Sequence, residues 1–261
     1  MDEAPRGRGG GQVISFVAAL RRAVACAIEP GPPAGPPVEG SSVGLLADAV
    51  RAGGHDEPRW LRVPWSAAGV TVEIGAAPLS VTAPGLPRWL PVSWDETLEI
   101  CSLLGWVPFA ADLADAVHAA AELKLEPVTL VRTASDDTAK YMQALSTCRT
   151  YNDRMRAQIP CGFQGLIGSW GKHWILSNRN RHLHGRAGTT YGWHRANGSP
   201  IQGLGPDGKA PAHDAVWTDY SQLLVPLRRH CTDGDGQRRE LLDVYTSRGL
   251  SRDVASRLTW K

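Results

Sequence analysis

The half of the chain that begins near Gly165 consists mainly of short extended segments separated by turn-forming residues. Apolar and β-branched runs such as HWILS (173–177) and TTYGWH (189–194) lie between loops rich in Gly, Pro and Asn. Short runs bounded in this way are typical of strands joined by turns. The pattern therefore predicts a predominantly antiparallel sheet formed by the C-terminal half of the chain.

Helical patterns precede this region. Ser93-Trp94-Asp95-Glu96 fits a capping box, in which Ser93 accepts from the Glu96 amide and the Glu96 side chain bonds back, so a helix is expected from Ser93 to about Leu104. Further helices are predicted at 41–51, 110–124, 135–158, 239–247 and 251–258, and VTVEIG (70–75) alternates like a half-buried strand. Helices followed by an antiparallel sheet predict an α+β fold, with the N-terminal helices packed on the sheet.

A proline-rich stretch, EPGPPAGPPVEG (29–40), cannot continue a helix and is predicted to be a linker. We therefore expect residues 1–40 to form a disordered arm and linker, and residues 41–261 to form a single α+β domain. The apolar run VISFVAAL (13–20) is followed by Arg21 and Arg22, which interrupt it where a secretion signal would stay apolar. This indicates a cytoplasmic protein, with a degenerate export signal as the alternative.

Several function classes are disfavoured by composition and by missing motifs. The net charge is only +2, and no apolar run reaches membrane-spanning length, so neither nucleic acid nor membrane is an expected partner. The five cysteines have no CxxC spacing, which favours buried or incidental thiols in a reducing compartment. The chain lacks GxxxxGK[ST], a GxGxxG between strand and helix, HExxH and GxSxG, so we expect an enzyme without a cofactor.

Aromatic residues and histidines gather between Lys172 and Val225, which is typical of a pocket floor, although a sheet core with satisfied histidines explains them equally well. Regular alternation would direct Tyr191 and Trp193 to one face of their strand, and Gly192 and His194 to the other. Gly192 would leave space for a ligand beside His194. A histidine titrates near neutrality and can act as acid or base.

Other polar residues could complete such a site. Asp219 could orient His194, while Tyr220 and Ser221 could donate to a developing oxyanion. Glu73 is a second candidate base if its face of the strand borders a cleft. The residues expected to bind the substrate, together with Tyr191, Trp193 and Tyr220, are Arg62, Lys172, Asn178, Arg179 and Gln202.

A metal site is the alternative to an acid/base site in this region. His182 and His184 would lie on one face of a strand, and His194, His213 and Asp219 could add ligands. Arginines surround the first two, however, and would raise the energy of a nearby dication. We therefore expect no metal.

The order of several segments resembles a group of uncharacterised secreted bacterial proteins. The matching stretches are WLRVPW (60–65), GKHWILSNR (171–179), YGWH (191–194), PIQ (200–202) and DYS (219–221), and their order extends from residue 60 to residue 221. The resemblance implies a shared fold. It departs where the group has KKD, replaced by KHW (172–174), and where His and Gly follow DYS, replaced by Gln222 and Leu223. The ending of the group also loosely resembles a signature of L,D-transpeptidases, but this chain has neither their histidine nor their nucleophilic cysteine.

Two functions follow as hypotheses. The first is a cofactor-independent acid/base enzyme of natural-product biosynthesis, which condenses an amino-acid substrate into an imine and cyclises it, as in a Pictet-Spengler reaction giving a β-carboline. It is similar in type to the small actinobacterial Pictet-Spenglerases. Glu73, His194 and Asp219 would be catalytic. The alternative is a cell-envelope peptide hydrolase or peptide-binding module on an L,D-transpeptidase-like scaffold. A tryptophan-rich chain of this size is also compatible with a symmetric homodimer.

Overall fold

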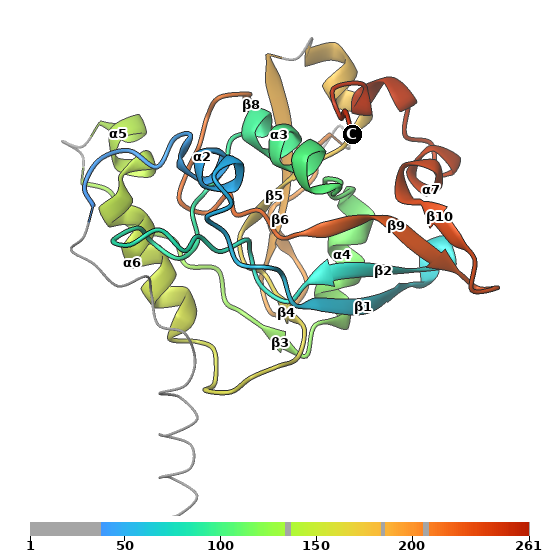
Figure 1. Cartoon of the computed structure of the whole chain (residues 1–261), viewed down its shortest axis with the longest axis horizontal. Helices are drawn as coiled ribbons and strands as arrows, with labels where there is room; N and C mark the ends of the chain where they lie inside the picture. Colours follow the sequence, from blue (N-terminus) through green and yellow to red (C-terminus); the bar gives the residue numbers. More distant parts are fainter. Residues whose placement is uncertain (1–37, 134–136, 184–185, 206–208, 261) are drawn as a thin grey trace, which may run out of the picture.

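The computed structural model describes residues 38–133, 137–183, 186–205 and 209–260, and these form the predicted α+β fold (Figure 1). The helices are α2 (Leu45–Arg51), α3 (Trp94–Leu104), α4 (Ala111–Ala120), α5 (Thr138–Gln143), α6 (Leu145–Arg156) and α7 (Leu241–Ser247), with 3-10 turns η1 (Ser66–Ala68), η2 (Asn178–Leu183) and η3 (Arg252–Ala255). The predicted N-terminal arm lies almost entirely outside the described residues.

The strands form two four-stranded sheets and one short pair. They are β1 (Trp60–Trp65), β2 (Val70–Gly75), β3 (Leu123–Lys124), β4 (Ile167–Gly168), β5 (Lys172–Ile175), β6 (Ala187–His194), β7 (Pro200–Gln202), β8 (Ala212–Asp214), β9 (Leu227–Asp233) and β10 (Arg238–Glu240). One sheet has the order β1-β2-β9-β10, and the other has β5-β6-β7 with β8 also paired to β6. Both are antiparallel, whereas β3 and β4 pair in parallel.

The first sheet differs from the prediction because it is not confined to the C-terminal half. Strands β1 and β2 form a hairpin through η1, and β2 then pairs with β9 from the end of the chain. Val70, Val72 and Ile74 are buried, because they alternate along β2 toward the face that packs on the core. The alternation predicted for β2 is therefore confirmed, whereas its pairing with the distant β9 was not predicted.

The predicted capping box at the start of α3 is present. The Ser93 hydroxyl accepts from the Glu96 amide at 3.2 Å, and the Glu96 carboxylate accepts from the Ser93 amide at 2.8 Å. The other Glu96 oxygen accepts from the Gly44 amide at 2.9 Å, just before α2. Burial raises the pKa of Glu96, and these N–H donors oppose that effect. The cap therefore also fixes α2 against α3.

The helix predicted over 135–158 is instead two helices, α5 and α6, which meet at Ala144 in an extended conformation. The cause is a contact with a segment far away in sequence. The Ser42 amide donates to the Gln143 carbonyl at 2.7 Å, and the Leu145 amide donates to the Gly40 carbonyl at 2.9 Å. These bonds replace helical ones, so the chain turns at Ala144.

Two further predicted elements are shorter or irregular. The run YSQLLVPL (220–227) is buried but pairs only through an isolated bridge between Leu223 and Pro91 before β9 begins. The helix expected over 251–258 is the single 3-10 turn η3. The first segment makes single backbone bonds to several neighbours, such as those from the Leu79 amide to the Leu224 carbonyl and from the Val92 amide to the Gln222 carbonyl, both at 2.8 Å. Apolar periodicity does not distinguish such irregular pairing from a regular strand.

One contiguous apolar core extends from Leu46 to Leu258. Helix α4 contacts both sheets, through β1 of the first and β6 of the second. In Figure 1 it lies beside the horizontal strands β1 and β2 and the upright strand β6. Residues on α4 are therefore placed where the two sheets come together.

Candidate functional site

Helix α4 and strand β6 together build a polar cluster around Asp115. Leu113, Ala114, Val117 and His118 form the buried stripe of α4, and Asp115 lies at its edge. Asp115 and His118 are three residues apart and so share one side of the helix. Both side chains point toward the C-terminal end of β6, where Tyr191 and His194 lie.

The alternation expected along β6 is wrong at its end. Gly192 has a φ of 99° and Trp193 a φ of 56°, both in the left-handed region. Tyr191 and His194 consequently lie on the same side and both contact Asp115, whereas the Trp193 ring packs on the other side, near Lys172 and Tyr151. A positive φ at a tryptophan is unusual and is the kind of strain found at functional sites.

Glycine is therefore required at position 192 by the left-handed backbone conformation, and not by the approach of a ligand. A Cβ at this position would lie 3.3 Å from His173 Cδ2 and 3.5 Å from His194 Cε1. The gap it leaves is about the size of a methyl group. The expectation that Gly192 opens space for a substrate is thus replaced by a narrow gap between two histidine rings.

Asp115 is the residue that orients His194. The His194 Nε2 to Asp115 Oδ1 distance is 2.7 Å, and the Tyr191 hydroxyl donates to the same carboxylate at 2.9 Å and 3.2 Å. The His194 side chain is 3% exposed, whereas that of Asp115 is 51% exposed. The carboxylate thus faces solvent and fixes a buried imidazole with Nε2 as its donor.

His118 and Ser169 lie behind His194. The rings of His118 and His194 stack with centroids 4.6 Å apart and planes 20° apart. The Ser169 Oγ is 3.1 Å from His118 Nδ1 and donates to the His194 carbonyl at 2.6 Å. Ser169 also has a φ of 66°. Two strained residues, Ser169 and Trp193, therefore bracket the histidine pair.

Burial changes the pKa of several members of the cluster. It lowers the pKa of His118 to about 4, with a further contribution from the neighbouring His194, and it lowers the pKa of His173 to about 3. Burial, and then Asp115, raise the pKa of the Tyr191 hydroxyl. At neutral pH His118 and His173 are thus neutral, and Tyr191 is a hydrogen-bond donor.

A solvent-reachable hollow of about 350 Å³ opens on this cluster. Its wall includes Lys124 together with Asp115, His118, Tyr191 and His194, and the rest comes from Ala119, Ala196, Asn197, Gly198 and Pro200. A much smaller void behind it reaches Ser169, His173 and the apolar core. The hollow can admit a small molecule, and the void cannot.

Asp219 does not orient His194, which corrects the expectation from sequence. Its Oδ2 accepts from Lys172 Nζ at 2.6 Å, and the side chains of the two residues are 6% and 13% exposed. Its Oδ1 accepts from the amide and hydroxyl of Ser221 at 2.9 Å and 2.5 Å. The Tyr220 hydroxyl accepts from the Leu130 amide at 3.0 Å. These groups form a buried structural network, and Ser221 is not aimed at an oxyanion.

The remaining predicted residues are dispersed. Asn178 bonds Gly249 and Ser251, and Arg179 donates to the Ala210 carbonyl, so both hold loops together. Gln202 lies opposite Gly192 on β7. Arg62 and Glu73 are cross-strand neighbours, and Glu73 forms an ion pair with Arg228 at 3.0 Å. Glu73 alternates with Ile74, which borders the small void near His194, so its side chain leaves the opposite face of β2.

The histidines considered for a metal site lie on separate elements. His182 lies in the 3-10 turn η2 and not on a strand, and His184 is outside the described residues. His213 is on β8 and packs edge-on against Trp174. Within the described ranges, no three His, Cys, Asp or Glu side chains are grouped to hold a metal ion.

The cysteines correct another expectation. Cys101, Cys148 and Cys231 are buried free thiols, as expected, but Cys161 is disulfide-bonded. A disulfide is favoured by oxidising compartments. Across the part of the chain that the structure describes, no helix combines the length and apolar character needed to cross a bilayer.

Known proteins do not add to this assignment. Comparison with family profiles, curated proteins and solved structures gives no match. The site must therefore be assigned from its own geometry. The sequence predicts Tyr191 and His194 as site residues, but not Asp115 or Ser169. The spacing of Asp115 and His118 on one helix face was the available signal.

His118 should make folding stability depend on pH. An unfolded histidine has a pKa near 6.5, whereas the pKa of folded His118 is about 4, so protons bind preferentially to the unfolded chain between these values. The free energy of unfolding should fall as the pH falls from 6.5 toward 4, by up to about 1.4 kcal/mol per pH unit from this residue. Urea unfolding between pH 6.5 and 5 measures the slope.

The variant His118→Gln should have a shallower slope than the wild type over this range. His182→Gln removes an exposed histidine and serves as the control. Equal slopes for the wild type and His118→Gln would contradict the assignment.

Proposed function

We propose that this protein is a cofactor-independent acid/base enzyme whose reaction takes place at the hollow beside Asp115. The observation that supports it is the 2.7 Å hydrogen bond between His194 Nε2 and Asp115 Oδ1, at the wall of a hollow large enough for a small substrate. The exposed carboxylate exchanges protons with the substrate, while the buried imidazole supplies or takes up the balancing proton. Tyr191 holds the carboxylate in place.

We further propose an amino-acid-type substrate and a condensation that ends in ring closure. Imine formation requires a proton on the departing water, and cyclisation of the Pictet-Spengler type requires loss of a ring proton. One acid/base pair can do both in turn. Lys124, exposed at the wall of the hollow, is suitably charged to hold a substrate carboxylate.

The reaction is tested by incubating the purified protein with tryptophan and a panel of aldehydes. Mass spectrometry should detect a product equal to the two reactants less one water, formed faster than in buffer, and its resistance to borohydride reduction would distinguish the ring-closed tetrahydro-β-carboline from the open imine. No acceleration with any aldehyde would refute the Pictet-Spengler proposal.

Substitutions in the pair should separate catalysis from folding. His194→Gln and Asp115→Asn should each lower turnover by roughly a hundredfold, because each removes one partner of the proton exchange. Asp112→Asn is the matched control on the same helix, since Asp112 pairs with Arg248 at the surface. Circular dichroism checks the fold. Unchanged turnover in both site variants, or loss of turnover in Glu73→Gln instead, would contradict the assignment.

A peptide hydrolase is the second candidate, favoured by the 3.1 Å approach of Ser169 Oγ to His118 Nδ1 and by the strained backbone of Ser169. Against it, Ser169 is buried, its hydroxyl donates to the His194 carbonyl, and the low pKa of His118 makes it a weak base. Labelling of Ser169 by a fluorophosphonate probe, absent in Ser169→Ala, would favour the hydrolase.

Cellular location separates the same two candidates. The arginines after the N-terminal apolar run support a cytoplasmic protein, whereas the Cys161 disulfide supports an oxidising compartment. Recovery of the protein from the culture supernatant would favour the envelope function. Intact protein in the cytosolic fraction would favour the biosynthetic one.

A further inference from the structure

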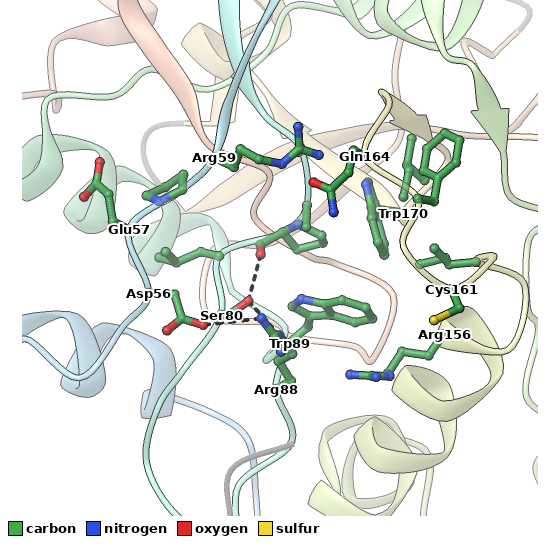
Figure 2. Close-up of a pocket in the computed structure, with 18 residues that line it drawn as sticks. Asp56, Glu57, Arg59, Ser80, Arg88, Trp89, Arg156, Cys161, Gln164 and Trp170 are labelled. Atoms are coloured by element: carbon green, nitrogen blue, oxygen red, sulfur yellow. Dashed lines mark hydrogen bonds and ion pairs between the residues drawn. The ribbon is translucent and has the colours of Figure 1, made fainter. Parts of the chain in front are cut away.

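A second, larger cavity lies away from the His194 cluster and shares no lining residue with its hollow. It encloses about 530 Å³ between the segment before β1, the loop after β2, and the end of α6 with the loop that follows it (Figure 2). This volume is within the range of small-molecule sites.

Two tryptophans form a preorganised wall of this cavity. Trp89 and Trp170 pack edge to face with ring centroids 4.8 Å apart. The Trp89 backbone is held at both ends by Asn152 of α6, whose amide oxygen accepts at 2.8 Å and whose amide nitrogen donates at 2.9 Å. The Trp170 carbonyl accepts from the Tyr151 hydroxyl at 2.8 Å. The wall is therefore rigid before any ligand arrives, which lowers the entropic cost of binding.

Three guanidinium groups surround this aromatic wall. Arg88 is committed, since it bonds Ser80 at 3.3 Å and faces Asp56 at 3.5 Å. Arg59 and Arg156 lie on opposite sides of the cavity in Figure 2. Neither forms an ion pair with another described residue.

The acids at the cavity do not neutralise these two arginines. Asp56 faces Arg88, and Glu57 accepts weakly from Trp60 Nε1 at 3.4 Å. The guanidinium groups of Arg59 and Arg156 thus remain without a partner carboxylate among the described residues, because the Glu57 carboxylate is directed toward Trp60. A ligand complementary to this wall and charge carries a flat apolar body and an anionic group.

We propose that this cavity binds a small aromatic carboxylate, with its rings against Trp89 and Trp170 and its carboxylate paired with Arg156 at one end of the wall. The proposal does not depend on the acid/base function, because binding is measured without turnover. Arginine suits this role, since its planar fork pairs with both carboxylate oxygens.

The test uses the full chain with 2-naphthoate and its neutral counterpart 2-naphthamide, which differ in charge but hardly in shape. Isothermal titration calorimetry should show the acid binding at least roughly tenfold more tightly than the amide. Arg156→Gln should remove most of this preference, while Arg156→Lys should keep part of it. Arg154→Gln, on the exposed face of the same helix, is the matched control and should bind like the wild type.

Three outcomes would overturn the proposal. Equal binding of the acid and the amide would show that the arginines do not select the ligand, as would equal losses in Arg156→Gln and Arg154→Gln. Inorganic phosphate binding as tightly as 2-naphthoate would show that the tryptophans contribute nothing. If Arg156→Gln fails to fold, Arg156→Met should lose the same preference, and retention there would be equally negative.

Discussion

Gly171→Ala is expected to destabilise the fold by more than about 3 kcal/mol, enough to prevent recovery of soluble protein. A Cβ at Gly171 would lie 2.0 Å from the Ser221 carbonyl oxygen, and the next residue along, Lys172, donates its amide to that same oxygen at 2.8 Å. The clash is with backbone that is hydrogen-bonded on both sides, so no side-chain rotation relieves it. Urea unfolding, or the soluble fraction after expression, measures the effect.

Gly234→Ala is the matched control for this prediction. Gly234 lies in the tight turn between β9 and β10, and a Cβ there meets no atom within 4 Å. Its free energy of unfolding should stay within about 0.5 kcal/mol of the wild type. Similar stability of the two alanine variants would show that the approach of Gly171 to Ser221 is not as close as described.

Asp219→Ala is expected to lower the free energy of unfolding by about 3–5 kcal/mol. It leaves the Lys172 ammonium buried without its partner, and it also removes the acceptor of the Ser221 amide and hydroxyl. The ion pair is almost fully enclosed, so water cannot replace the lost carboxylate. Urea unfolding of Lys172→Met, Asp219→Asn and the double variant should give a coupling energy above about 1 kcal/mol.

The exposed pair of Arg252 and Asp243 provides the comparison. Its atoms are equally close, at 2.5 Å, but the side chains are 75% and 48% exposed. Asp243→Ala should cost no more than about 1 kcal/mol, because solvent screens the pair. Comparable losses at Asp219 and Asp243 would mean that burial does not determine the strength of the pair.

The sequence predicted those elements whose cause is local. The capping box of Ser93 and Glu96 and the alternation of β2 both depend on residues within a few positions of one another. The break at Ala144 depends on backbone bonds to residues 40–42, a hundred residues earlier, and no local pattern encodes it. The pairing of β2 with β9 is distant in the same way.

The candidate site was predicted in part for the same reason. Tyr191 and His194 share a segment that reads clearly as a strand, but their partner Asp115 lies on a helix more than seventy residues earlier. Asp219 was predicted to orient His194, but its carboxylate accepts a hydrogen bond from Lys172 instead. Left-handed backbone at Gly192 and Trp193 reversed the faces that alternation assigns. Neither the ion pair nor the reversal can be read from spacing.

The position of α4 between the two sheets gives its bond to β6 a mechanical role. Asp115 lies on a helix that packs on β1 of one sheet and on β6 of the other, and His194 is at the end of β6. A relative sliding of the sheets by about 1 Å would stretch their 2.7 Å contact beyond hydrogen-bonding range. The hydrogen bond between Asp115 and His194 is therefore intact only while the two sheets keep their alignment.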